Sequence, residues 1–171
     1  MSDPSKVALA EWYALYVKPR HEKTVDSKLQ EKCIESYLPL RRILKQWSDR
    51  KKWVEEPLFR SYLFIHTDVK DRQRALYTHG VLKLVAFGDE PARVREDEIS
   101  TIRRILAEKT DVESCPLVSV GDTVEIARGP LMGIRGRLEE IRGTGRLVMS
   151  IDSIKQALRF SVSLSDVKVV R

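Results

Sequence analysis

Hydrophobic positions in the first third of the chain change from one periodicity to another. Residues 12–17, WYALYV, are aromatic and β-branched and stop before Pro19, which predicts a strand. From His21 to Glu35 the apolar residues recur at four-residue spacing among charges, at Val25, Leu29 and Cys33. This spacing predicts an amphipathic helix whose apolar seam packs on a sheet.

The next segments predict strands joined by turns. Residues 37–47 and 52–59 are rich in strand-forming side chains, and the turn-forming residues Ser48-Asp49-Arg50 between them predict a long hairpin. Residues 62–66 predict a further strand. Asp68 or Asp71 can cap a short helix that runs through Leu76 and stops near Gly80, and residues 81–87 predict the strand that follows.

A third helix is predicted where acidic residues begin a periodic apolar segment. Glu96-Asp97-Glu98 precede the isoleucines, and Arg103-Arg104 lie further along. One face of this helix carries Ile99, Ile102, Ile105 and Leu106. The order β-α-β-β-β-α-β-α implies an α+β fold, a sandwich with a mostly antiparallel sheet.

The pattern changes after Ala107. Residues 108–116, EKTDVESCP, have weak periodicity and end in proline, which predicts a linker. From Leu117 onward no helix is indicated, and short alternating segments are punctuated by glycines, as in a small β-barrel. These segments are residues 123–127, 137–142, 146–151 and 160–164. We therefore expect an N-terminal domain over residues 1–106, a linker over 107–116 and a C-terminal barrel over 117–171.

Charge points to a polyanionic partner for the N-terminal domain. The chain has 31 Lys and Arg against 25 Asp and Glu, a net charge of +6, and +5 of this lies in residues 1–110. The expected hairpin concentrates cations at Arg41, Arg42, Lys45, Arg50, Lys51 and Lys52, with Trp47 and Trp53 on either side of its turn. Such a hairpin suits phosphates and exposed bases. The alternative is a solvated tip whose lysines prevent edge pairing.

The stretch PLFRSYLFI, residues 57–65, allows two interpretations. Strand alternation places Phe59, Leu63 and Ile65 on one face, with the aliphatic bias of a core. The opposite face carries Leu58, Arg60, Tyr62, Phe64 and His66, a mixture closer to an interface. A sheet covered on both sides would also give a continuous apolar stretch, so both interpretations stay open.

Several function classes are disfavoured. Cys33 and Cys115 lie in no metal-binding or redox spacing, the three histidines make no zinc signature, and no Ser/His/Asp set or phosphate-binding glycine loop is present. No segment approaches the ~20 apolar residues of a membrane span, and residues 1–17 lack the pattern of an export signal. We expect a reduced, cytoplasmic, monomeric protein that is not an enzyme and uses no metal or cofactor.

Three motifs in order carry a resemblance to a known family. WYALYVKPRHEK, EPLFRSYLFIHT and GVLKLVAFG resemble the N-terminal domain of the NusG family of transcription elongation factors. VGDTVEIARGPLMGIRGRLEEI resembles the KOW motif, a small barrel, that follows this domain in the family. EPLF and the basic hairpin are most similar to the specialised RfaH-like and UpxY-like antiterminators, which act on selected operons.

The resemblance implies a mechanism and its residues. The N-terminal domain of the family grips the clamp helices of the largest RNA polymerase subunit, which by position implies Leu58, Phe59, Tyr62, Phe64 and Phe87. The gate loop of the second subunit is met by the segment that here is Asp71, Arg72 and Gln73. Upstream or non-template DNA meets Lys18, Arg20, His21, Thr78 and His79. Bridging the polymerase cleft in this way disfavours the open, paused state.

This chain departs from the family pattern at two places. Phe59-Arg60-Ser61-Tyr62 stands where the family usually has Phe-Pro-Gly-Tyr or Phe-Pro-Asn-Tyr. Residues 152–156, DSIKQ, replace the Ser-Ile-Phe-Gly-Arg through which a KOW domain would recruit Rho or the ribosome. The glycines of the KOW segment each disfavour a helix by about 1 kcal/mol, so we expect it to stay a barrel. The competing functions are a free-standing RNA-binding module and a ribosome-associated KOW protein.

Overall fold

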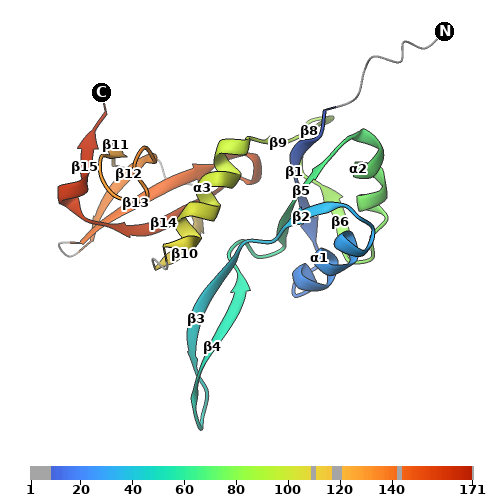
Figure 1. Ribbon diagram of the computed structural model, residues 1–171, viewed down its shortest axis with the longest axis horizontal. Coiled ribbons are helices and arrows are strands. Elements are labelled where there is room, and N and C mark those ends of the chain that lie inside the picture. The colour runs from blue at the N-terminus through green and yellow to red at the C-terminus, as the bar shows by residue number, and fades with distance from the viewer. Residues whose placement is uncertain (1–8, 109–110, 117–120, 142–143, 171) are drawn as a thin grey trace. The chain divides into compact units, whose positions relative to one another are not determined.

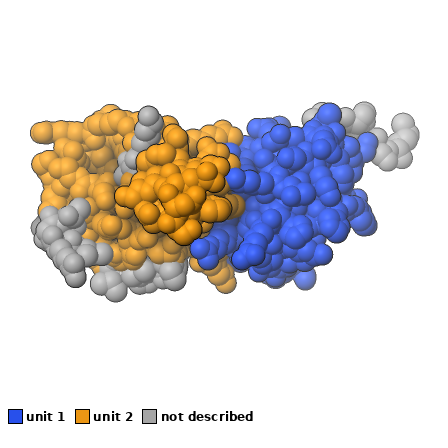
Figure 2. All heavy atoms as spheres, turned by 90° about the horizontal axis from the view of Figure 1, so that it is seen from below, with its two compact units in different colours: residues 1–38, 59–96 blue, residues 39–58, 97–171 orange. Residues whose placement is uncertain are grey.

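The computed structural model describes residues 9–108, 111–116, 121–141 and 144–170 (Figure 1). The chain divides into two compact units, residues 1–38 with 59–96 and residues 39–58 with 97–171, which Figure 2 colours separately. No helix in these described ranges is long and apolar enough to cross a bilayer.

The first unit is an antiparallel sheet with two helices. Its elements are β1 (Glu11–Val17), α1 (Glu22–Glu31), β2 (Glu35–Tyr37), β5 (Tyr62–Thr67), α2 (Val69–Leu76), β6 (Val81–Leu84), β7 (Ala86–Phe87), β8 (Glu90–Pro91) and β9 (Arg93–Val94). The strand order is β2-β5-β1-β6, β9 also pairs with β1, and β7 and β8 form a ribbon of their own. The paired strands are antiparallel throughout, as the sequence predicts.

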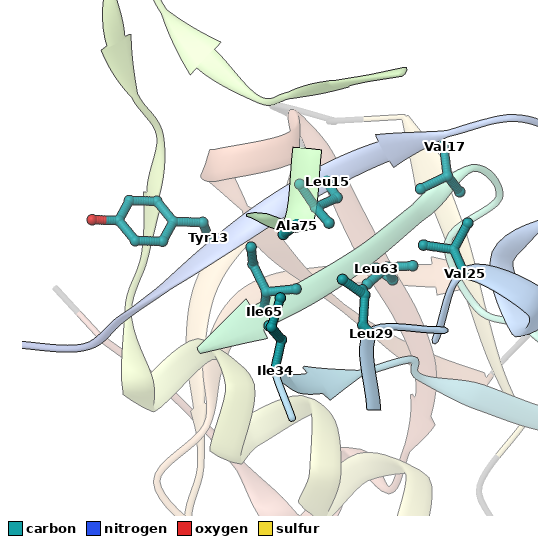
Figure 3. Packing of buried hydrophobic residues seen from close by; sticks show 9 residues of the cluster. All are labelled: Tyr13, Leu15, Val17, Val25, Leu29, Ile34, Leu63, Ile65 and Ala75. Carbon is teal, nitrogen blue, oxygen red and sulfur yellow. The ribbon is translucent and has the colours of Figure 1, made fainter. Parts of the chain in front are cut away.

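One face of this sheet makes the core with the helices. Leu15 and Val17 of β1 and Leu63 and Ile65 of β5 pack with side chains of α1 and α2 (Figure 3). The rest of this cluster is Tyr13, Val25, Leu29, Ile34 and Ala75. Because successive strand side chains point to opposite faces, Leu63 and Ile65 of PLFRSYLFI are both turned to the helices. The core assignment of Leu63 and Ile65 is confirmed.

Helix α1 ends earlier than the apolar spacing predicts. Cys33 has φ +59°, its N–H donates to the Gln30 carbonyl oxygen at 2.9 Å, and the Ile34 N–H donates to the Leu29 carbonyl oxygen at 2.9 Å. This is the Schellman pattern, in which a left-handed residue stops the helix and the next apolar residue folds back onto it. Ile34 therefore joins the core, and Cys33, expected in the seam, is exposed.

The second unit begins with the hairpin, and the single strand expected over residues 37–47 is wrong. Pro39 has no N–H to donate and separates β2, which pairs with β5, from β3 (Leu40–Gln46). β3 pairs with β4 (Lys51–Pro57) in a separate two-stranded sheet. The helix α3 (Glu96–Ala107) follows in this unit and buries Ile99, Ile102 and Ile105, the face that periodicity predicts.

The C-terminal strands form one antiparallel sheet in the order β10-β14-β13-β12-β11-β15. Their bounds are β10 (Val112–Pro116), β11 (Asp122–Ile126), β12 (Arg135–Ile141), β13 (Thr144–Ile151), β14 (Gln156–Val162) and β15 (Val167–Val169), with short 3-10 turns η1 (Asp152–Ile154) and η2 (Leu164–Asp166). Residues 112–116, expected in the linker, pair with β14. Residues VESCP gave little strand signal because they contain one β-branched residue, Val112, followed by polar or small side chains and a proline.

Candidate functional site

The tight turn before β5 explains the departure at Arg60-Ser61. The Tyr62 N–H donates to the Phe59 carbonyl oxygen at 3.3 Å, and Ser61 has φ +64°. A positive φ at the third position is the mark of a type II turn, which favours proline at the second position and glycine or asparagine at the third. Arg60 and Ser61 thus occupy the positions where the related pattern has Pro-Gly or Pro-Asn, and the turn is retained.

Buried hydrogen bonds hold this turn. The Ser61 N–H donates to Oε1 of Glu22 at 2.8 Å, and the Ser61 carbonyl oxygen accepts from the Val17 N–H at 2.8 Å. Both Ser61 and Glu22 are buried, at 7% and 5% exposure. The first turn of α1 and the end of β1 therefore fix the chain where β5 begins.

We expect Ser61→Gly to raise the free energy of unfolding by about 0.5–1 kcal/mol. Glycine removes the left-handed strain of a side-chain-bearing residue, and its greater freedom in the unfolded chain offsets part of the gain. Chemical denaturation of the two proteins measures the difference. Ser61→Val is the matched variant, because a branched residue at positive φ should destabilise; equal stabilities for Gly and Val would show that the turn is not strained.

The sheet face opposite the helices is aromatic. Phe64 stacks on Tyr37 with ring centroids 6.3 Å apart and meets Phe59 edge-on at 6.1 Å, and Trp12 stacks on His66 at 5.0 Å. Phe64 and Phe59 are fully buried, and Leu58 is 2% exposed. The expected alternation is correct for Tyr62 to His66. It is wrong for Phe59, which was expected on the face of Leu63 and Ile65 but packs against Phe64, because the turn at Ser61 precedes the strand. Phe64 is itself buried, so it shapes this face without being available on it.

One end of the aromatic face stays accessible. Tyr62 is half-buried, and its ring lies 5.2 Å from the ring of Tyr16 on the paired strand β1. The Lys83 ammonium lies 5.8 Å from the Tyr16 ring centroid. Burial and the neighbouring Tyr16 raise the pKa of Tyr62, which keeps its hydroxyl protonated near neutral pH. Sequence reasoning missed Tyr16 and Lys83, because only cross-strand register brings them to Tyr62.

Phe87 lies apart from β5 in sequence and on another strand. It is 50% exposed and lies on β7, which pairs with β8. The single strand expected over residues 81–87 is thus divided between β6 and β7. Half-exposed aromatic side chains such as Tyr62 and Phe87 are the kind that anchor protein interfaces.

The segment Asp71-Arg72-Gln73 lies in α2. The side chain of Asp68 caps this helix by accepting from the Asp71 N–H at 2.8 Å, and Asp71 pairs with Arg74 at 2.5 Å. The Arg72 guanidinium lies 4.9 Å from the ring centroid of Tyr13. Asp71 and Arg72 thus have partners within the unit, and Gln73 is the exposed member.

A cavity of about 470 Å³ lies beside Arg72 and Tyr13. Glu11 binds both the Tyr13 hydroxyl, at 3.0 Å, and the Arg93 guanidinium, at 2.8 Å. Burial and this hydrogen bond to Glu11 raise the pKa of Tyr13. The side chains of Glu11, Tyr13 and Arg93 in the wall of this cavity therefore bind one another rather than a ligand.

The five residues expected to meet DNA lie just before α1 and just after α2, and four of them are at least partly exposed. His21 and His79 have ring centroids 6.4 Å apart, and the Lys18 N–H donates to the Gly80 carbonyl oxygen at 2.8 Å. Lys18 and Arg20 are exposed beside them. Thr78 is 3% exposed, and its hydroxyl accepts from Lys32 Nζ at 2.8 Å. Thr78 is therefore a buried residue of this region and is not available for contact with DNA.

The C-terminal sheet carries several ion pairs. Hydrogen bonds from Arg135 and Lys168, at 2.6 and 3.1 Å, lower the pKa of Glu125. Burial raises the pKa of the Cys115 thiol, which keeps it protonated and unreactive. Ile154, in the segment that departs from the family, is 5% exposed. In the described residues no three His, Cys, Asp or Glu side chains gather as metal ligands would.

Comparison with known proteins identifies the family of this chain. Residues 10–103 match the family model described as "Transcription termination factor nusG". The chain belongs to the NusG family. It is 26% identical over 164 residues to the transcription termination/antitermination protein NusG of Thermus thermophilus, an alignment that covers 82% of this chain and 89% of that protein.

A solved structure has the same fold. The structure described as "Domain interaction in Thermotoga maritima NusG" superposes with a TM-score of 0.61 at 22% identity and covers 95% of this chain and 98% of that one. The prediction of a NusG-type fold with a strand-rich C-terminal part is thereby confirmed. NusG-family proteins are transcription factors of elongation and termination that interact with RNA polymerase.

Proposed function

We propose that this NusG-family protein binds the clamp helices of the largest RNA polymerase subunit through the accessible end of its aromatic sheet face. The observation that supports this most directly is the Tyr16–Tyr62 pair, which leaves two partly exposed phenol rings on the same face as the buried Phe64. Tyr62 and Phe87 would be the anchors. Leu58, Phe59 and Phe64 are buried and would support the fold rather than contact polymerase. Amphipathic tyrosine at the centre of a contact is a frequent source of binding energy.

The remaining surfaces suit the other contacts of a cleft-bridging factor. Gln73 would contact the gate loop of the second subunit, and Asp71 and Arg72 would flank this contact on α2. Lys18, Arg20, His21 and His79 would contact upstream or non-template DNA, where cations replace condensed counterions. A protein that holds both sides of the cleft stabilises the closed, elongating polymerase over the paused one, by its higher affinity for that state.

We also propose that it acts as a specialised paralog on selected operons, suppressing pausing or termination there. The EPLF sequence and the basic hairpin support this. Transcription through a long operon, compared with and without the protein, tests it. Read-through that rises equally on every template would instead indicate a general factor.

The binding test uses purified core RNA polymerase and the full chain. We expect Tyr62→Ala/Phe87→Ala to weaken polymerase binding at least about tenfold, which corresponds to about 1.4 kcal/mol. Biolayer interferometry measures the affinity, and pause lifetimes in single-round transcription should lengthen toward the factor-free value.

The matched control is Met132→Ala. Met132 is 59% exposed between β11 and β12 of the second unit, outside the proposed contacts, so its truncation should leave the affinity unchanged. Wild-type protein that does not bind polymerase, or a double variant that binds as tightly as wild type, would contradict the proposal. Tight RNA binding lost in the same double variant would favour a free-standing RNA-binding module.

A further inference from the structure

The hairpin of β3 and β4 has two chemically different faces. Residues directly opposite in an antiparallel pair share a face, so Leu44 lies beside Trp53 and Arg42 beside Glu55 on one face. Arg41 faces Glu56, and Lys45 faces Lys52, on the other. Alternation thus separates an aromatic face, which also carries Lys51, from a charged face, which also carries the Ile43–Val54 pair.

The cations of the hairpin are unequally matched. Arg41 and Lys45 share the carboxylate of Glu56, at 3.3 and 3.4 Å. Lys51 and Lys52 are exposed, and no carboxylate among the described residues lies within 4.0 Å of either ammonium. Arg50 meets Asp49 only at 3.9 Å. Positive charge is therefore in excess at the turn end of the hairpin.

The aromatic face exposes large apolar side chains at the same end. Trp53 is 55% exposed and Leu44 48% exposed, and Trp47, next to the turn, is 53% exposed. The Arg42 guanidinium lies 5.2 Å from the Trp53 ring centroid, a cation–π contact that holds the indole in place. Nothing in the packing of a two-stranded ribbon requires an indole to stay exposed between cations.

A cavity in the same unit opens beside this indole. It measures about 430 Å³ and is lined by Trp53, Arg42, Ile43, Leu106 and Ala107, with Asp111 and Glu55 as acceptors. The volume is within the range of small-ligand sites, and its walls combine one aromatic ring, one planar cation and aliphatic side chains. A planar, partly polar group fits this lining.

We propose that Trp53, positioned by Arg42, stacks an unpaired base of single-stranded nucleic acid, and that Lys51, Lys52 and Arg50 hold the flanking phosphates. An indole face binds a base only when that base is unstacked, so duplexes should lack this contact. An acidic peptide would satisfy the lysines but would leave the aromatic face without a partner. This binding does not require polymerase, so it stands or falls separately from the function proposed above.

Fluorescence anisotropy with the full chain tests the proposal. The probes are fluorescein-labelled 15-nucleotide oligothymidylate, 15-nucleotide oligouridylate and a 15-base-pair DNA duplex. We expect Trp53→Leu to weaken single-strand binding at least about fivefold, because stacking by one aromatic side chain is lost. Trp53→Phe should keep most of the affinity, and both variants should leave duplex binding unchanged.

Charge removal gives an independent readout. Lys51→Ala/Lys52→Ala should lower the slope of log K against log salt by about 1.4, since each phosphate contact on a single strand contributes about 0.7. A preference for oligothymidylate or for oligouridylate identifies the strand type, and either result supports the proposal. Equal binding by Trp53→Leu and wild type, a preference for the duplex, or no binding to any probe would overturn it. Circular dichroism melting of Trp53→Leu confirms that the chain is folded.

Discussion

Phe64→Ala is expected to lower the free energy of unfolding by about 3–5 kcal/mol, the usual cost of truncating a fully buried phenylalanine. Phe64 has no exposed surface and contacts the rings of Tyr37 and Phe59 at centroid distances of 6.3 and 6.1 Å. Removing its ring leaves a cavity between β2, β5 and the turn before β5. Urea unfolding followed by near-ultraviolet circular dichroism measures the loss.

The comparison with Tyr62 makes this prediction informative. Tyr62 lies two residues earlier on the same face and is half-buried, so Tyr62→Ala should cost clearly less stability than Phe64→Ala. Phe64→Leu, which fills most of the space, should cost about 1–2 kcal/mol. If Phe64→Ala were as stable as wild type, Phe64 would be a surface residue, and the interior placement would be wrong.

This difference changes how polymerase-binding variants are interpreted. Alignment by position makes Tyr62 and Phe64 equal candidates, yet a Phe64 variant would lose binding by unfolding the site. Activity lost by Tyr62→Ala in a folded protein reports a contact, whereas activity lost by Phe64→Ala reports packing.

The second large effect is expected in the C-terminal sheet. Gly121→Ala should destabilise it by about 3 kcal/mol, because Gly121 has φ +111° and an added Cβ would collide with the backbone carbonyl oxygen of Leu138 on β12. Left-handed strain and overpacking each contribute. Hydrogen exchange should show faster opening of amides in β11 and β12, while amides of β1 and β5 exchange as in wild type.

Gly129→Ala is the matched control for Gly121→Ala. Gly129 also has a positive φ, +82°, but an added Cβ would meet no atom within 4 Å. It should therefore cost only the conformational strain of about 1–2 kcal/mol. Equal effects of the two substitutions would show that the close approach to β12 is unimportant.

Local sequence signals were sufficient for much of the fold. The apolar face of α3 and the two faces of β5 follow from side-chain periodicity. The sequence also narrows the cap of α2 to Asp68 or Asp71, of which the structure has Asp68. The signals were insufficient where one residue ends an element. Pro39 divides the expected strand of residues 37–47, and Cys33 ends α1 in a conformation that usually calls for glycine.

The candidate site shows the same division. Its aromatic composition and the basic hairpin can be read from the chain, and the NusG-type motifs assign an expected role to each residue. Exposure cannot be read in this way: Phe64 and Thr78 are buried, while Tyr16 and Lys83, absent from the expected set, lie at the accessible end of the aromatic face.

The sequence by itself determined the family, the element types and the two faces of each strand, because these depend on residue type and spacing along the chain. Only the tertiary structure decided which residues of a strand face are buried and which residues of distant strands contact each other. Those outcomes depend on cross-strand register and on packing between segments that are distant in the sequence. Examples are the pairing of Tyr16 with Tyr62 and the hydrogen bond from Ser61 to Glu22. No local pattern encodes them.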